Sequence, residues 1–90
     1  MLYSVSYSER AAQVRDSLPE DRRALLERGL RKLADDPRPK ISIPISSDEN
    51  TRSLALTQNI AVEYVISEGL LIVVVVHVVD TSQVLLDNED

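Results

Sequence analysis

The stretch "LLIVVVVHVVD", from Leu70 to Asp80, decides the fold, because nine aliphatic residues are interrupted only by His77, the single histidine of the chain. Valine and isoleucine favour strands, and an apolar run without polar alternation is typical of a strand that is buried on both faces. The run is about half as long as the ~20 residues that a membrane-spanning helix needs. It therefore predicts a central strand over Leu70–Val79 and no membrane span.

Alternating apolar residues predict two more strands before this run. Arg52, Leu54 and Leu56 share one face of the first strand, and Ile60, Val62, Tyr64 and Ile66 share one face of the second. Gln58-Asn59 supplies the turn between them. Glu68-Gly69 supplies a strong hairpin turn into the central strand, because glycine is able to take a positive φ. Short turns between consecutive strands predict an antiparallel meander.

The N-terminal segment predicts a strand followed by a helix. Tyr3, Val5 and Tyr7 alternate with serines, as on a strand with one buried face. Ser8 is a good N-cap, and the acidic Glu9 after it suits the first turn of a helix. Ala11, Val14 and Leu18 then recur at helical spacing.

A second helix is predicted from Glu20 to about Asp35, after Pro19, and the two helices form an antiparallel hairpin. Its apolar stripe consists of Leu26, Leu30 and Leu33. Gly29 beside this stripe costs roughly 1 kcal/mol relative to alanine, so it predicts a close approach to the first helix.

The segments that flank the meander are shorter. Three prolines and the isoleucines at 41, 43 and 45 predict an extended edge segment followed by an exposed loop. A last short strand is predicted over Val84–Leu86, before an acidic tail at about residues 87–90.

These elements predict one α+β domain over residues 1–90. It consists of an antiparallel β-meander with an N-terminal strand, and the two-helix hairpin packs on one face. Because one helical hairpin covers only one face of Leu70–Val79, the other face needs a second cover. A partner chain is the simplest cover, so we expect a homodimer or a complex with another protein.

The composition excludes several kinds of site. Without cysteine there is no disulfide framework, no zinc–cysteine site and no thiol nucleophile. The N-terminus does not have the pattern of a signal peptide, so we expect a soluble, cytoplasmic protein. The net charge of −5 disfavours nonspecific nucleic-acid binding, although all ten basic residues lie between Arg10 and Arg52 and a local patch of them could suffice. No glycine-rich phosphate loop, metal-spaced cluster or Ser/His/Asp array is present, so no cofactor, metal or small-molecule ligand is expected.

The order of motifs resembles the RelE/ParE toxin superfamily of type II toxin–antitoxin systems, and identifies the chain as a divergent member. The matching residues are Tyr7-Ser8 with Ala11, then Leu30, Leu33 and Pro37, then Arg52 and Leu54, and finally Tyr64 and the strand after Gly69. The resemblance covers roughly residues 2 to 84.

The resemblance implies both an activity and partners. Active members are metal-independent, ribosome-dependent ribonucleases that cut messenger RNA, or poisons of DNA gyrase, and an antitoxin neutralises them. The ribonucleases place Arg, Lys, Glu, His or Tyr side chains on the concave sheet face, where they orient the 2′-hydroxyl and stabilise the phosphorane-like charge. A ribosome, messenger RNA and an antitoxin-like protein are therefore the implied partners.

Several positions depart from the family pattern. One family arginine would fall near Ile60 or Ala61, and another would fall at Val78 or Thr81. In place of a terminal aromatic residue stand Val84, Leu85 and Leu86. Loss of one donor to an anionic transition state costs on the order of 3 kcal/mol of barrier, so these departures argue against efficient RNA cleavage.

His77 and Arg52 remain as the candidate catalytic residues. As a general acid or base, His77 would need a face that solvent reaches and a pKa near neutrality. Its valine neighbours favour a structural or interface role instead. Arg52 resembles an arginine that is largely structural in the family and that would pair with a carboxylate such as Glu63 across the hairpin.

Two functions therefore stand side by side. The chain is either a toxin that inhibits translation by ribosome-dependent mRNA cleavage, or a catalytically degenerate member that acts as a dimerising or protein-binding module.

Overall fold

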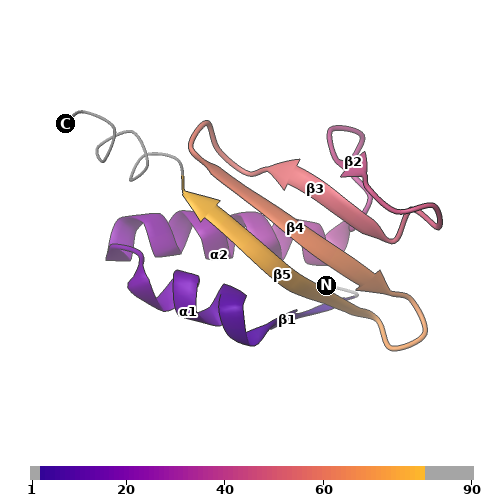
Figure 1. Cartoon of the computed structure of the whole chain (residues 1–90), viewed down its shortest axis with the longest axis horizontal. Helices are drawn as coiled ribbons and strands as arrows, with labels where there is room; N and C mark the ends of the chain where they lie inside the picture. Colours follow the sequence, from indigo (N-terminus) through magenta and orange to yellow (C-terminus); the bar gives the residue numbers. More distant parts are fainter. Residues whose placement is uncertain (1–2, 81–90) are drawn as a thin grey trace.

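The computed structural model describes residues 3–80 as two helices and one five-stranded sheet. The elements are β1 (Ser4–Tyr7), α1 (Glu9–Ser17), α2 (Glu20–Asp35), β2 (Ile43–Pro44), β3 (Thr51–Ala55), β4 (Ile60–Ser67) and β5 (Ile72–Asp80). The strand order is β1-β5-β4-β3-β2, and Figure 1 shows β4 lying between β3 and β5. This arrangement confirms the predicted α+β fold with its antiparallel meander.

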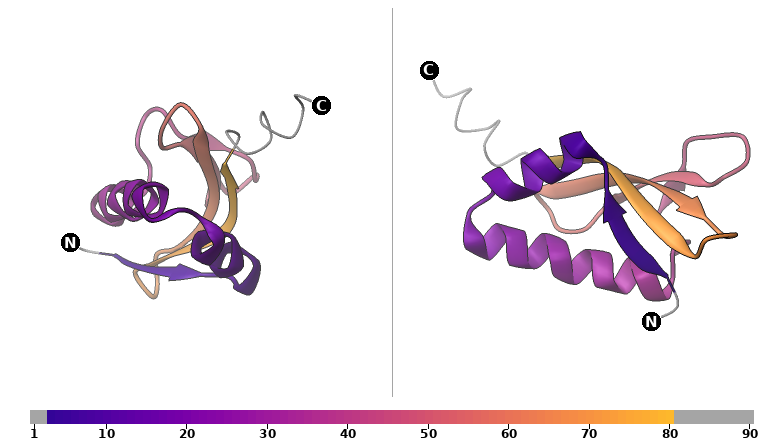
Figure 2. Two further views of the ribbon diagram at one scale, coloured as in Figure 1. Left: turned by 90° about the vertical axis from the view of Figure 1, so that its left-hand side faces the viewer. Right: turned by 90° about the horizontal axis from the view of Figure 1, so that it is seen from below.

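The central strand joins the two halves of the chain. β5 pairs antiparallel with β4 on one side and parallel with β1 on the other, so it is not an edge strand. The parallel pair is possible because α1 and α2 lie between β1 and the meander in the sequence and carry the chain back. The views in Figure 2 place α2 along one side of the sheet.

The helices bury the residues that their spacing predicts. Ser8 caps α1, because its Oγ accepts a hydrogen bond from the backbone N–H of Ala11 at 3.1 Å. The stripe of α2 faces the sheet in one core, whose largest fully buried side chains are Tyr64, Leu26, Leu30, Leu33, Ile60, Val62, Val73 and Val75. The two helices therefore cover one face of the sheet, as predicted.

A β-bulge breaks the alternation of β5. Glu63 of β4 pairs with His77, but the next residue, Tyr64, pairs with Val75, so Val76 is the extra residue. Ser8 fixes this position, because its Oγ donates to the carbonyl of Val76 at 3.2 Å. The helix-facing positions of β5 are consequently Val73, Val75, Val78 and Asp80. The bulge keeps His77 off the helix-facing side.

Two local predictions are wrong. The predicted strand begins only at Ile72, so Leu70 and Leu71 lie in the turn, where Leu71 has a positive φ of 54°. Gly29 does not make room for α1, because a Cβ at this glycine would lie 2.9 Å from Cδ2 of Leu56. The close approach of α2 is to the loop that follows β3.

The predicted edge segment is confirmed in part, because β2 is extended and the three isoleucines are exposed, but Ile41 lies in a turn and Ser42 is buried. Its three isoleucines are 75%, 64% and 51% exposed in chain order, and Pro44 lies in the two-residue edge strand β2. The predicted strand at Val84–Leu86 and the acidic tail lie outside the described residues. Among residues 3–80, no helix is long and apolar enough to cross a membrane.

Candidate functional site

His77 lies on the face of the sheet that the helices leave uncovered. It is half-buried, and the register sets it opposite Glu63, whose side chain is exposed. We call this surface the open face; around the histidine it carries the half-buried aliphatic residues Ala61, Val65, Ile72, Val74 and Val79. Its centre is therefore aliphatic, with one imidazole and one carboxylate.

Arg52 lies on the opposite, helix-facing side. Its guanidinium is buried, with Nε donating to Oγ of Ser42 at 2.8 Å and Nη1 donating to the carbonyl of Glu49 at 3.1 Å. Nη2 donates to the carbonyl of Ser42 at 3.4 Å. The predicted pair with Glu63 is wrong, because adjacent residues on a strand point to opposite faces and Arg52 stands opposite Tyr64 in the register.

The two predicted catalytic residues are thus not brought together. Arg52 holds the segments on both sides of β2, at Ser42 and at Glu49, whereas His77 faces away from it on the other side of the sheet. Sequence periodicity favours this arrangement, because Arg52 shares a face with the buried Leu54. The position of His77 did not follow from periodicity, since it depends on the bulge.

Tyr64 is fully buried beside Arg52. Its hydroxyl donates to the carbonyl of Pro37 at 2.7 Å, and burial raises the pKa of this phenol above its ordinary value. A neutral phenol that is already committed as a donor to a backbone carbonyl is placed for structure and not for proton transfer. The aromatic residue of the family pattern therefore lies in the core.

An ion pair that was not predicted from the sequence joins the end of β5 to α2. Nη1 of Arg22, in the first turn of α2, lies 3.2 Å from Oδ1 and 3.4 Å from Oδ2 of Asp80. The Asp80 side chain is almost fully buried, so this residue belongs to the strand and not to the turn that its type predicts. The pair fixes the start of α2 to the last residue of the meander.

The charge of the open face limits its chemistry. No lysine or arginine follows Arg52 in the sequence, so β4 and β5 carry none. His77 and Glu63 could exchange protons with a substrate, but neither β4 nor β5 supplies a fixed cation to stabilise a developing phosphorane. Within residues 3–80, no group of three or more His, Cys, Asp or Glu side chains could hold a metal ion.

Comparison with solved structures gives similar folds. A mutant of the Escherichia coli toxin RelE, in complex with an antitoxin RelBc peptide, superposes with a TM-score of 0.74 at 18% identity, over 100% of this chain and 97% of that chain. The toxin–antitoxin complex RelBE2 of Mycobacterium tuberculosis gives 0.75 at 20% identity, over 89% of this chain and 99% of the other. The archaeal RelE–RelB complex of Pyrococcus horikoshii gives 0.71 at 15% identity, over 89% and 96%.

No protein-family model and no curated protein matches this sequence. The similarity therefore rests on the order of strands and helices over nearly the whole chain. The sequence resemblance and the observed sheet agree, and the chain has the fold of the RelE toxins in a strongly divergent sequence.

Proposed function

We propose that this chain is the toxin-like component of a toxin–antitoxin-type system, and that it acts by binding proteins rather than by cleaving RNA. One observation carries the proposal: the open face is aliphatic around His77 and carries no lysine or arginine on β4 or β5, whereas the resembling ribonucleases are expected to place cationic side chains on a face of their sheet. An aliphatic surface without cations offers a phosphate backbone no interaction that offsets the loss of its hydration. Such a surface therefore favours apolar partners over RNA.

The partners follow from the same surface and from the comparisons. Solved structures with this fold include RelE toxins bound to RelB antitoxins, which supports an antitoxin-like protein as one partner. The open face also supports a second copy of the chain, because its half-buried valines gain from any apolar cover. A cytoplasmic location is part of the proposal.

Expression in bacteria tests the proposal. Induction of the full chain without any antitoxin should leave growth unchanged, and an active RelE toxin induced from the same vector should arrest it. The product of the adjoining reading frame should co-purify with the chain when the two are expressed together. Growth arrest with messenger RNA cut in the ribosomal A site would overturn the proposal.

The second candidate is metal-independent, ribosome-dependent mRNA cleavage. The observation that favours it is the cross-strand placement of His77 opposite Glu63, which gives the open face one acid–base pair. If this function holds, the wild-type chain is toxic and His77→Ala is harmless although it is equally well folded. Primer extension on a reporter message would locate the cut.

A further inference from the structure

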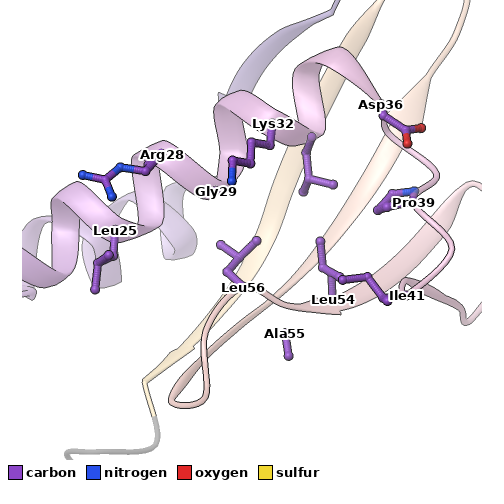
Figure 3. A pocket seen from close by; sticks show the side chains of 11 residues that line it. Leu25, Arg28, Gly29, Lys32, Asp36, Pro39, Ile41, Leu54, Ala55 and Leu56 are labelled. Atoms are coloured by element: carbon purple, nitrogen blue, oxygen red, sulfur yellow. The ribbon is translucent and has the colours of Figure 1, made fainter.

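A groove runs between α2 and β3, on the other side of the sheet from His77. It has a volume of about 430 Å³. Its lining residues come from α2, from the loop after it and from β3 with its exit, namely Leu25, Arg28, Gly29, Lys32, Leu33, Asp36, Pro39, Ile41, Leu54, Ala55 and Leu56. Figure 3 shows Leu25, Leu54 and Leu56 in the space between helix and strand.

Gly29 and the short strand β2 give the groove its shape. Gly29 lets the side chain of Leu56 lie against the helix, so the floor is closed at its middle. β2 pairs only with Arg52 and Ser53, so it does not extend beside Ala55 and the outer side of the groove stays open. From Leu25 to Asp36 the helix wall is about 16 Å long, which is three turns.

The chemistry of the groove is aliphatic in the floor and cationic at the helix rim. Leu33 and Leu54 are buried in the floor, while Leu25 is 40% and Ile41 is 75% exposed at its two ends. Arg28 and Lys32 stand one turn apart on the helix and make no ion pair within the described part of the chain. Asp36 follows at the end of the same wall, so the rim carries two cations and one carboxylate.

We propose that this groove binds an aliphatic, acidic segment of a partner protein. The segment places leucine-, isoleucine- or valine-type side chains over Leu25, Leu56 and Ile41, and its carboxylates meet Arg28 and Lys32. The inference rests on the proposed protein-binding function and gives that function a location separate from the open face. The floor offers no buried polar group to orient a small molecule, which favours a protein segment.

A defined peptide tests the site on the full chain. The probe is a synthetic amphipathic peptide with leucines at i, i+4 and i+7 and glutamates at the flanking positions, and the control peptide carries lysine in place of each glutamate. Titrated into the isotopically labelled chain, the acidic peptide should shift the amide signals of Gly29, Leu54 and Leu56. The lysine peptide should bind at least about tenfold more weakly.

Matched variants separate the groove from the rest of the surface. Ile41→Asp should weaken binding of the acidic peptide about tenfold or more, whereas Ile43→Asp, on the same exposed segment but outside the groove lining, should change it less than about twofold. Lys32→Glu should weaken binding, and Arg31→Glu, an exposed neighbour that does not line the groove, should not. All four positions are exposed, so each variant keeps the fold, which well-dispersed amide signals confirm.

Several results would overturn the inference. They are the absence of saturable shifts, shifts centred on His77 and Val74, and equal weakening by Ile41→Asp and Ile43→Asp. Loss of self-association in Ile41→Asp alone would assign the groove to a second copy and would equally overturn it. Toxicity of the wild-type chain would refute the proposed function while leaving peptide binding at the groove intact, so the two failures are distinguishable.

Discussion

At the scale of single residues, Arg52 shows what the alternation of apolar and polar residues can and cannot predict. Its alternation with Leu54 predicts a buried position, and the position is buried. Its partners, Ser42 and the carbonyl of Glu49, flank β2 in a segment that contains three prolines and a residue at positive φ, and no periodicity encodes the course of that segment. The face of a residue was therefore predictable from the sequence, but its hydrogen-bond partners were not.

Replacement of Arg52 by methionine should lower the free energy of unfolding by about 2–3 kcal/mol, because it leaves the oxygen atoms of Ser42 and Glu49 without their buried donor. Urea denaturation measures the loss. The control is Arg38→Ala, which removes a more exposed pair with Glu68 at 3.0 Å and a hydrogen bond to Asn50, and it should cost about 1 kcal/mol. Equal losses in the two variants would contradict a structural role for Arg52.

His77 should contribute little to stability, because it is half-buried on the open face and does not belong to the core. His77→Ala should change the free energy of unfolding by no more than about 1 kcal/mol. The control on the same strand is Val75→Ala, which empties a fully buried site and should cost about 2 kcal/mol or more. A His77→Ala variant that unfolds as easily as Val75→Ala would place the imidazole in the core.

At the scale of elements, period-two and helical spacing predicted the helices, the meander and the cap at Ser8. These spacing patterns failed where a single residue breaks the regular alternation. The carbonyl of Val76 at the bulge accepts a hydrogen bond from Ser8, 68 residues away in the sequence, and the space at Gly29 accommodates Leu56 from the loop after β3. Such contacts follow from the assembled sheet, which is why local patterns did not contain them.

The turn between β4 and β5 gives a prediction at this scale. Leu71 has φ of 54°, a conformation that costs a residue with a Cβ about 1 kcal/mol, and its side chain is 41% exposed. Leu71→Gly should therefore raise the free energy of unfolding by about 0.5–1 kcal/mol. Leu70→Gly, in the same turn but without a positive φ, should not stabilise the chain. Thermal unfolding of the two variants, followed by circular dichroism, checks this difference.

At the scale of the whole molecule, charge and apolar surface are distributed unequally over the two sides of the sheet. The cations lie on the helices, the loops and β3, and the strands behind the open face carry none after Arg52. The absence of cations from β4 and β5 was predictable from the sequence alone, because no lysine or arginine follows Arg52. The groove between α2 and β3 was not predictable in this way, since it depends on where β2 ends relative to Ala55.

The open face leads to a prediction about assembly. The chain should self-associate at micromolar concentration in sedimentation experiments, because apolar cover of Val74, Val79 and their neighbours is favourable. Each copy carries a net charge of −5, so added salt should strengthen the association by screening the repulsion between copies. Val74→Glu should abolish it. Leu70→Glu makes the same change of charge in the exposed turn and should leave a dimer. A wild-type chain that stays monomeric at all salt concentrations would show that the open face is covered in another way.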